Sequence, residues 1–220
     1  MRSAPGDDRP STDLTARARI RDAALEQFGE HGFEGATIRG IAESAGVSPG
    51  LVQHHFGTKE ALRRACDQAV LDLVRRKLEA TQDGRIASPD FLAALYESGR
   101  PLVRYLSRTI AERSSATLFD ELAGGTEMFL TTTWPDRFPL GSPRTRDAAA
   151  VLVSQSAGTL VLHEHLARRM GLDPTNDVLS PRIGLAQLDV YQVIGGYVGS
   201  EIGRRIRDAA ERYAAQTGEA

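Results

Sequence analysis

The sequence has one cysteine, Cys66, and lacks an apolar run of the roughly 20 residues that a membrane-spanning helix needs. A single cysteine excludes a disulfide within the chain, which fits a reducing compartment. The N-terminal segment 1–12 also lacks the apolar stretch of a secretory signal. We therefore expect no membrane partner and a cytoplasmic location.

An excess of positive charge is absent too. The formal net charge is −2, and residues 1–60 contain 7 lysines and arginines against 9 acidic residues. Proteins that bind nucleic acids through bulk charge are strongly basic. If this chain binds DNA, a local basic surface must supply the attraction.

No pair of strand-like segments stands out, and helical periodicity runs through most of the chain. Residues 1–12 are rich in Pro, Gly, Asp and Ser, which is typical of a disordered tail. Caps, apolar positions and Gly or Pro stops predict helices at 13–32 (with Asp13 as N-cap), 37–44, 49–56, 59–80, 89–108, 112–133, 144–170 and 181–215. Breaks are expected at Gly124-Gly125 and near Gly195-Gly196, and 134–143 is a predicted loop. The chain is therefore expected to be all-α.

Residues 37–62 have the spacing of two short helices joined by a tight turn and followed by a third helix. Gly46 stands where the chain must turn sharply, because glycine adopts a positive φ at little cost. Ser48 and Pro49 fit the N-cap and first position of the next helix, and Thr58 fits the cap of the helix after it. This is the pattern of a helix-turn-helix, whose second helix can enter a DNA major groove. A purely structural helical hairpin is the alternative.

The segment FGEHGFEGATIRGIAESAGVSPGLVQHHFGTKEAL, residues 28–62, resembles the N-terminal domain of the TetR family of bacterial transcriptional regulators. The resemblance starts near Leu14 and covers about 50 residues, because the remainder is similar to the family only in its helical character and length. It implies an N-terminal three-helix helix-turn-helix DNA-binding domain joined to a C-terminal helical bundle for ligand binding and dimerisation. The implied divisions are 13–60 for DNA binding, 61–80 for a connecting helix and 88–216 for the bundle.

The resemblance also implies which residues meet double-stranded DNA. They are Thr37, Arg39, Ser48, Pro49, Gly50, Leu51, Gln53, His54, His55 and Lys59. Two of these depart from the family pattern. Gln53 replaces a common tyrosine and can hydrogen-bond an adenine edge or a phosphate, whereas Pro49 removes a common cationic contact.

Two other patterns suggest different chemistry. Residues 46–50 satisfy the G-x-S-x-G elbow of hydrolases, but that motif needs a preceding strand, and the preceding residues have no β character. His163 and His165 lie two residues apart and point in different directions on a helix, which is a poor spacing for a metal. We therefore expect no catalytic residue, no metal and no cofactor, and an α-helical enzyme is the least favoured class.

Apolar residues in the middle of the chain are interpreted mainly as core. Family members hold an effector pocket among these helices, so the resemblance implies that some line a pocket. The candidates are Tyr96, Tyr105, Phe119, Met128, Phe129, Trp134 and His163. Gly195, Gly199 and Gly203 repeat at a spacing of four and suggest a close helix contact, within the domain or across a dimer. The alternative is that the helix breaks at Gly195-Gly196 and simply tolerates glycine there. These glycines and Leu152 are the candidate dimer residues.

The resemblance implies a homodimer that reads a near-palindromic operator with two recognition helices. Helices around 144–170 and 181–205 would form the interface, and an unknown small-molecule effector would shift the dimer away from DNA. The expected function is a repressor released by its effector. A regulator that needs no effector, or one that responds to a partner protein, is the alternative.

Overall fold

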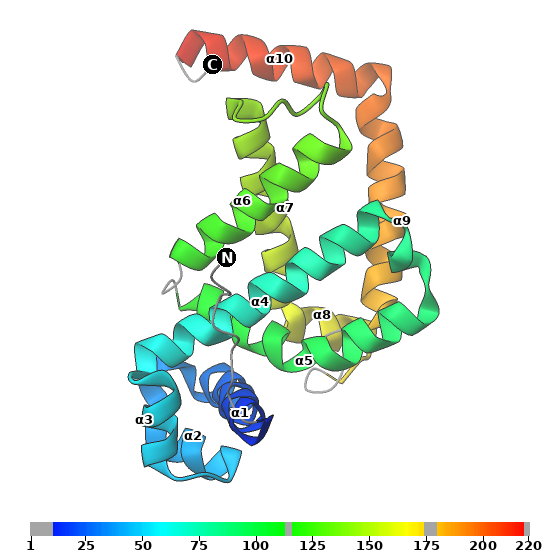
Figure 1. Ribbon diagram of the computed structural model, residues 1–220. Coiled ribbons are helices and arrows are strands. Elements are labelled where there is room, and N and C mark those ends of the chain that lie inside the picture. Colours follow the sequence, from blue (N-terminus) through cyan, green and yellow to red (C-terminus); the bar gives the residue numbers. More distant parts are fainter. Residues whose placement is uncertain (1–10, 113–115, 174–179, 218–220) are drawn as a thin grey trace, which may run out of the picture. The chain divides into compact units, whose positions relative to one another are not determined.

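The computed structural model describes residues 11–112, 116–173 and 180–217, which are helical apart from short connections (Figure 1). No strand occurs within these ranges, so the all-α prediction is confirmed. Contacts group the chain into two compact units, the first holding α1 to α8 and the second α9 and α10. The predicted tail lies outside the described residues except for Ser11 and Thr12, which begin the first helix.

The first four helices begin at or near the predicted caps. They are α1 (Ser11–Gly35), α2 (Ile38–Ala45), α3 (Pro49–Phe56) and α4 (Lys59–Gln82). The side chains of Thr37, Ser48 and Thr58 each accept a hydrogen bond from a backbone N–H three residues on, at 3.0, 3.2 and 3.1 Å. Asp13 is not the cap of α1, because the helix already starts at Ser11. Gly32, with φ of 72°, interrupts α1 near the predicted stop.

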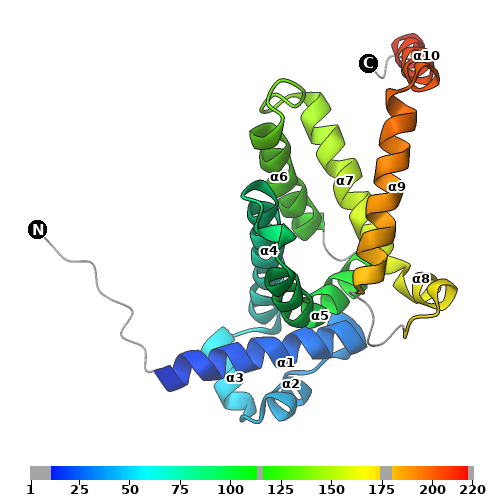
Figure 2. The ribbon, with the colours of Figure 1, turned by 90° about the vertical axis from the view of Figure 1, so that its right-hand side faces the viewer.

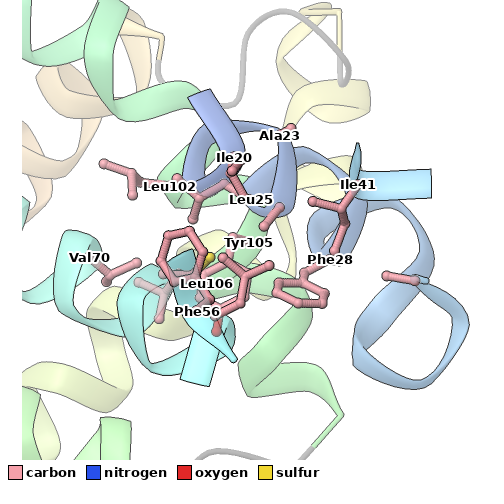
Figure 3. Close-up of a cluster of buried hydrophobic side chains, with 14 of the residues drawn as sticks. Ile20, Ala23, Leu25, Phe28, Ile41, Phe56, Val70, Leu102, Tyr105 and Leu106 are labelled. Carbon is pink, nitrogen blue, oxygen red and sulfur yellow. The ribbon is translucent and has the colours of Figure 1, made fainter. Parts of the chain in front are cut away.

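A continuous apolar core joins these four helices to the next one, α5 (Pro89–Ala111). Figure 3 shows Phe28 of α1 and Ile41 of α2 facing the same cluster as Tyr105 of α5. The rings of Phe28 and Tyr105 lie 6.2 Å apart, within the range of a stabilising aromatic pair. The three helices α1 to α3, called the head below, therefore share one packed interior with α4 and α5.

A short 3₁₀ turn (Arg85–Ala87) precedes α5, and α6 (Ala116–Thr133), α7 (Pro143–Val161) and α8 (His163–Met170) complete the first unit. In Figures 1 and 2, α6 and α7 run side by side. The predicted break at Gly124-Gly125 is wrong. α6 continues through both glycines because Leu122, Thr126 and Leu130 on its inner face are buried, and that packing outweighs a propensity cost of about 1 kcal/mol per glycine.

The predicted single helix 144–170 is also wrong, because it is broken at Leu162. The carbonyl of Leu160 accepts a hydrogen bond from the Ser107 hydroxyl of α5 at 2.9 Å, and the Nδ1 atom of His163 lies 2.8 Å from the same oxygen. These contacts occupy a carbonyl that would otherwise serve the helical ladder. A contact with α5, which the local sequence does not reveal, thus separates α7 from α8.

The second unit consists of α9 (Pro181–Gly199) and α10 (Glu201–Thr217). α9 passes through Gly195-Gly196, so the predicted interruption is displaced to Ser200. The Ser200 hydroxyl donates to the Tyr197 carbonyl at 2.6 Å and accepts from the Gly203 N–H at 3.4 Å. A Cβ atom on Gly203 would lie 2.3 Å from the Val198 carbonyl oxygen, so this corner requires glycine. The three spaced glycines therefore do not form a stripe on one helix.

Candidate nucleic-acid interface

The turn between α2 and α3 is built from three consecutive residues. Gly46 has φ of 64° and ψ of 41°, a left-handed conformation that strains any residue with a Cβ. The Val47 N–H donates to the Ala42 carbonyl at 2.9 Å, and Ser48 then caps α3. A helix, not a strand, precedes Ser48, and its hydroxyl accepts the cap bond. The geometry is therefore that of a helix-turn-helix and not of a nucleophile elbow.

α3 has one buried and one exposed face. Val52 and Phe56 are buried against the head, whereas Gln53 and His54 are exposed together with the small residues at the start of the helix, Ser48, Pro49 and Gly50. Leu51 is half-buried and packs against the core. This face leaves the backbone at the start of α3 open to a close approach by a base edge, as a groove-reading helix requires.

α2 lies beside α3 and adds two exposed side chains, Thr37 and Arg39. The Thr37 hydroxyl accepts the Gly40 N–H and can still donate its own proton to a phosphate oxygen. Arg39, two residues further on, carries a guanidinium into solvent. Both residues extend the exposed surface of α3.

Two of the predicted contacts have neighbours within the protein. His55 is half-buried, and its ring lies 5.5 Å from that of His54. The Lys59 ammonium lies 4.6 Å from the centre of the Phe33 ring and donates to the Glu34 carbonyl at 3.5 Å. Lys59 thus fastens the start of α4 to the end of α1, and a phosphate contact by it stays a prediction.

The sequence analysis missed two arginines of α1 that hold the helix-turn-helix in place. The Arg17 guanidinium lies 5.0 Å from the centre of the Phe56 ring at the end of α3. Arg19 donates to the carbonyls of Ala45 and Gly46 at the end of α2. These contacts join residues 26 to 39 positions apart, so no local pattern in the sequence could have indicated them.

Behind the interface, a polar pair links α4 to α5. The Tyr105 hydroxyl donates to the Asp67 carboxylate at 2.5 Å. Burial raises the pKa of Asp67, and the hydrogen bond from Tyr105 partly offsets that rise. Burial and the neighbouring carboxylate raise the pKa of Tyr105 as well. The neutral phenol is therefore the form that donates, and the bond fixes the register of the two helices.

The remaining predicted site residues are scattered. Among the pocket candidates, Tyr105 is buried in the shared core, Met128 and Trp134 are exposed, and Tyr96, Phe119, Phe129 and His163 are half-buried. Two surface hollows are described, and neither is lined by any of these residues. Of the dimer candidates, Leu152 is half-buried, and a Cβ at Gly195 or Gly199 would have no neighbour within 4 Å. The pocket and dimer assignments stay predictions.

Within the described ranges, no group of three or more His, Cys, Asp and Glu side chains could hold a metal ion. None of the helices described is long and apolar enough to cross a membrane. The His163 ring bonds a backbone carbonyl and His165 is exposed, so the two histidines do not converge.

The fold and the exposed face of α3 define a helix-turn-helix, the motif whose second helix can enter a DNA groove. Residues 20–66 match the family model described as "Bacterial regulatory proteins, tetR family". The N-terminal helices of the chain are thus similar to that family of regulators.

Named relatives match part of the chain. The HTH-type transcriptional regulatory protein RaaS of Mycobacterium tuberculosis is 50% identical over 105 residues, which is 46% of this chain and 47% of that protein. The HTH-type transcriptional repressor AcnR of Corynebacterium efficiens is 47% identical over 49 residues, 22% of this chain and 26% of that protein. The matches thus span about half or less of these relatives' own length. Both names are those of transcriptional regulators.

One solved structure supports the fold along most of the chain. It is described as "Molecular basis for control of antibiotic production by a bacterial hormones", with a TM-score of 0.53 and 20% identity. The similarity covers 81% of this chain and 97% of that chain. At this identity it supports the helical architecture beyond residue 66.

Proposed function

We propose that this protein is a sequence-specific DNA-binding transcriptional regulator in which α3 enters the major groove. The observation that carries the proposal is the exposed face of α3, held outward by a capped turn and a buried opposite face. The family-model match over residues 20–66 and the names of the relatives support it. Residues 13–60 would bind DNA, 61–80 would connect, and 88–216 would bind ligand and dimerise.

Within this interface, Gln53 would read a base and the flanking residues would position the backbone. An exposed amide can pair with an adenine edge, whereas Thr37, Arg39 and His54 can meet phosphates. Lys59 would contribute charge only if its ammonium leaves the Glu34 carbonyl. Base selectivity is therefore assigned to α3, and the salt-dependent part of the affinity to α2 and the end of α3.

The test begins with a pool of random duplexes of about 30 base pairs, long enough for two half-sites. The full-length protein should enrich one sequence family, and fluorescence anisotropy should then show salt-sensitive, selective binding to the enriched duplex. Gln53→Ala should weaken that binding roughly tenfold and relax selection at one base position, since a bidentate contact gives about 1–3 kcal/mol of discrimination. Gln155→Ala, at an exposed glutamine of α7, is the matched control. Failure to enrich any sequence would refute the function.

We propose a homodimer formed through α9. This helix exposes eight large apolar side chains, namely Leu185, Leu188, Val190, Tyr191, Val193, Ile194, Tyr197 and Val198. A helix with apolar residues around its circumference is normally buried, and a second copy of the same helix offers a self-complementary surface. The predicted dimer residues Gly195 and Gly199 belong to this helix.

Light scattering coupled to size exclusion tests the dimer. The wild-type protein should elute at twice the mass of one chain at micromolar concentration. Val193→Glu, at a side chain that is 73% exposed, should yield monomers because it places a charge in an apolar interface. Leu140→Glu, at a similarly exposed position (70%) in the loop before α7, should remain dimeric. A monomeric wild-type protein would exclude this arrangement.

Release by a small-molecule effector is the finer part of the proposal, and the family resemblance supports it. The half-buried residues Tyr96, Phe119 and Phe129 of α5 and α6 are the best placed to line a pocket, because they are neither sealed in the core nor fully exposed. A compound that binds there should raise the melting temperature and lower the affinity for the enriched duplex. A compound that does the first without the second would bind without regulating.

A further inference from the structure

The C-terminal end of α2 is fastened to α1 by one side chain. Arg19 donates from Nη2 to the Ala45 carbonyl and to the Gly46 carbonyl, the latter at 3.2 Å. These are carbonyls at the end of a helix, where the backbone ladder leaves acceptors without partners and the helix dipole favours a cation. Arg19 of α1 therefore supplies hydrogen-bond donors to the carbonyls at the C-terminal end of α2.

The same guanidinium lies against the residue at which the chain turns. A Cβ atom on Gly46 would lie 3.1 Å from Arg19 Nη2, so the arginine and the turn are in direct contact. Gly46 and Val47 are the residues that lead into the Ser48 cap, and their torsions set the direction in which α3 leaves α2. In Figure 2, α1 lies alongside α2 and α3, which places its side chains within reach of the turn.

We propose that Arg19 is a positioning residue for DNA recognition: it fixes the α2–α3 turn, and through the turn the angle at which α3 meets the groove. This inference rests on the proposed function, since it assigns a new role to a residue outside the recognition helix. Arg19 acts through two backbone carbonyls and not through a phosphate. Both bonds come from Nη2, whose two N–H groups point in fixed directions within the guanidinium plane, whereas the N–H groups of a lysine ammonium rotate freely.

The first test uses the free, full-length protein and so does not depend on any DNA. In Arg19→Ala, the backbone amides of Gly46 and Val47 should exchange with deuterium about tenfold faster than in the wild type, because the turn opens locally more often. Arg21→Ala is the matched control. It removes one positive charge from the same helix, but its partner is the neighbouring Asp22 and not the turn. Unchanged exchange at Gly46 and Val47 in Arg19→Ala would overturn the inference.

The second test uses the duplex enriched by the wild-type protein. Arg19→Ala should lower the affinity for this duplex about tenfold while affinity for a shuffled duplex changes little, so the selectivity ratio falls. The slope of log affinity against log salt should stay the same, because no phosphate contact is lost. Arg19→Lys should lie between the two proteins in selectivity, because it restores the charge but not the fixed directions of the two N–H groups.

The outcomes separate the alternatives. A salt slope that drops by about one in Arg19→Ala would mean a direct phosphate contact and would overturn the positioning role. Equal selectivity in Arg19→Lys and wild type would mean that charge alone matters, which also contradicts it. If the wild-type protein selects no sequence, the proposed function fails and this inference fails with it. If the wild type selects a duplex and Arg19→Ala binds it equally well, only this inference fails.

Discussion

Replacing Tyr105 by phenylalanine tests the link between α4 and α5. The substitution keeps the ring, which is 2% exposed and packs on Phe28, and removes only the hydroxyl that donates to Asp67 at 2.5 Å. A hydrogen bond to a charged acceptor contributes about 1.5–3 kcal/mol. Because Asp67 is half-buried, water can replace part of the lost donor. We therefore expect the free energy of unfolding to fall by about 1.5 kcal/mol at neutral pH.

The size of this loss should depend on pH. Burial raises the pKa of Asp67 above its ordinary value of 3.8, and the Tyr105 hydrogen bond works against that rise. Protonation of Asp67 therefore favours the folded state: its contribution to stability is fully present below the unfolded pKa and is lost as the pH rises through the folded pKa. In Tyr105→Phe the folded pKa rises further, so that contribution persists to higher pH. The difference between the two proteins should be largest at neutral pH and should shrink toward about pH 4.

Urea unfolding followed by circular dichroism at neutral pH and near pH 4 measures both effects. The matched control is Tyr96→Phe on the same helix, whose hydroxyl makes no hydrogen bond within the described part of the chain. That variant should change stability by less than about 0.5 kcal/mol. A loss of that small size in Tyr105→Phe, or a difference that grows as the pH falls, would refute the reasoning.

Two further predictions concern side-chain space and thiol access. Gly125→Ala should stabilise the protein by about 1 kcal/mol, because α6 is helical there and an added Cβ meets nothing within 4 Å. Gly29→Ala should lose that gain or destabilise, because its Cβ would lie 3.3 Å from the Tyr105 backbone nitrogen; thermal unfolding of the pair decides this. Cys66 is fully buried, and burial raises the pKa of its thiol, so a thiol reagent at neutral pH should label it only after unfolding. Rapid labelling of the native protein would contradict the packed head.

The part of the fold that local chemistry determines was predictable. Ser48 and Thr58 cap the helices that they were predicted to cap, and Gly46 turns where a positive φ was expected, because each feature depends on a few consecutive residues. The faces of α3 also follow from the spacing of Val52 and Phe56. The core of the candidate interface could therefore be read from about twenty residues.

The break at Leu162 depends on a contact between distant residues, the bond that Ser107 of α5 donates to the Leu160 carbonyl 53 positions away. The corner at Ser200 is local, since the Ser200 hydroxyl bonds Tyr197 and Gly203, each three positions away, but the glycines at 195 and 196 drew the prediction to the wrong residue. Gly124-Gly125 led to the opposite error. A break was predicted there, but the pair lies inside α6, whose other face is packed. Propensity indicates where a helix is weak, but tertiary contacts decide whether it ends there.

α1 contacts both the α2–α3 turn and α5. Arg19, in the N-terminal half of α1, holds the turn that orients α3, while Phe28 further along the same helix packs on Tyr105 of α5. Between these two residues α1 contributes the buried residues Ile20, Ala24 and Leu25 to the shared core, so the two parts of the helix cannot move independently without opening that core. A displacement of α5 would therefore be transmitted along α1 to the turn. For this reason, any effector that shifts α5 should change the exchange of the Gly46 and Val47 amides in the free protein, and Arg19→Ala should weaken that response.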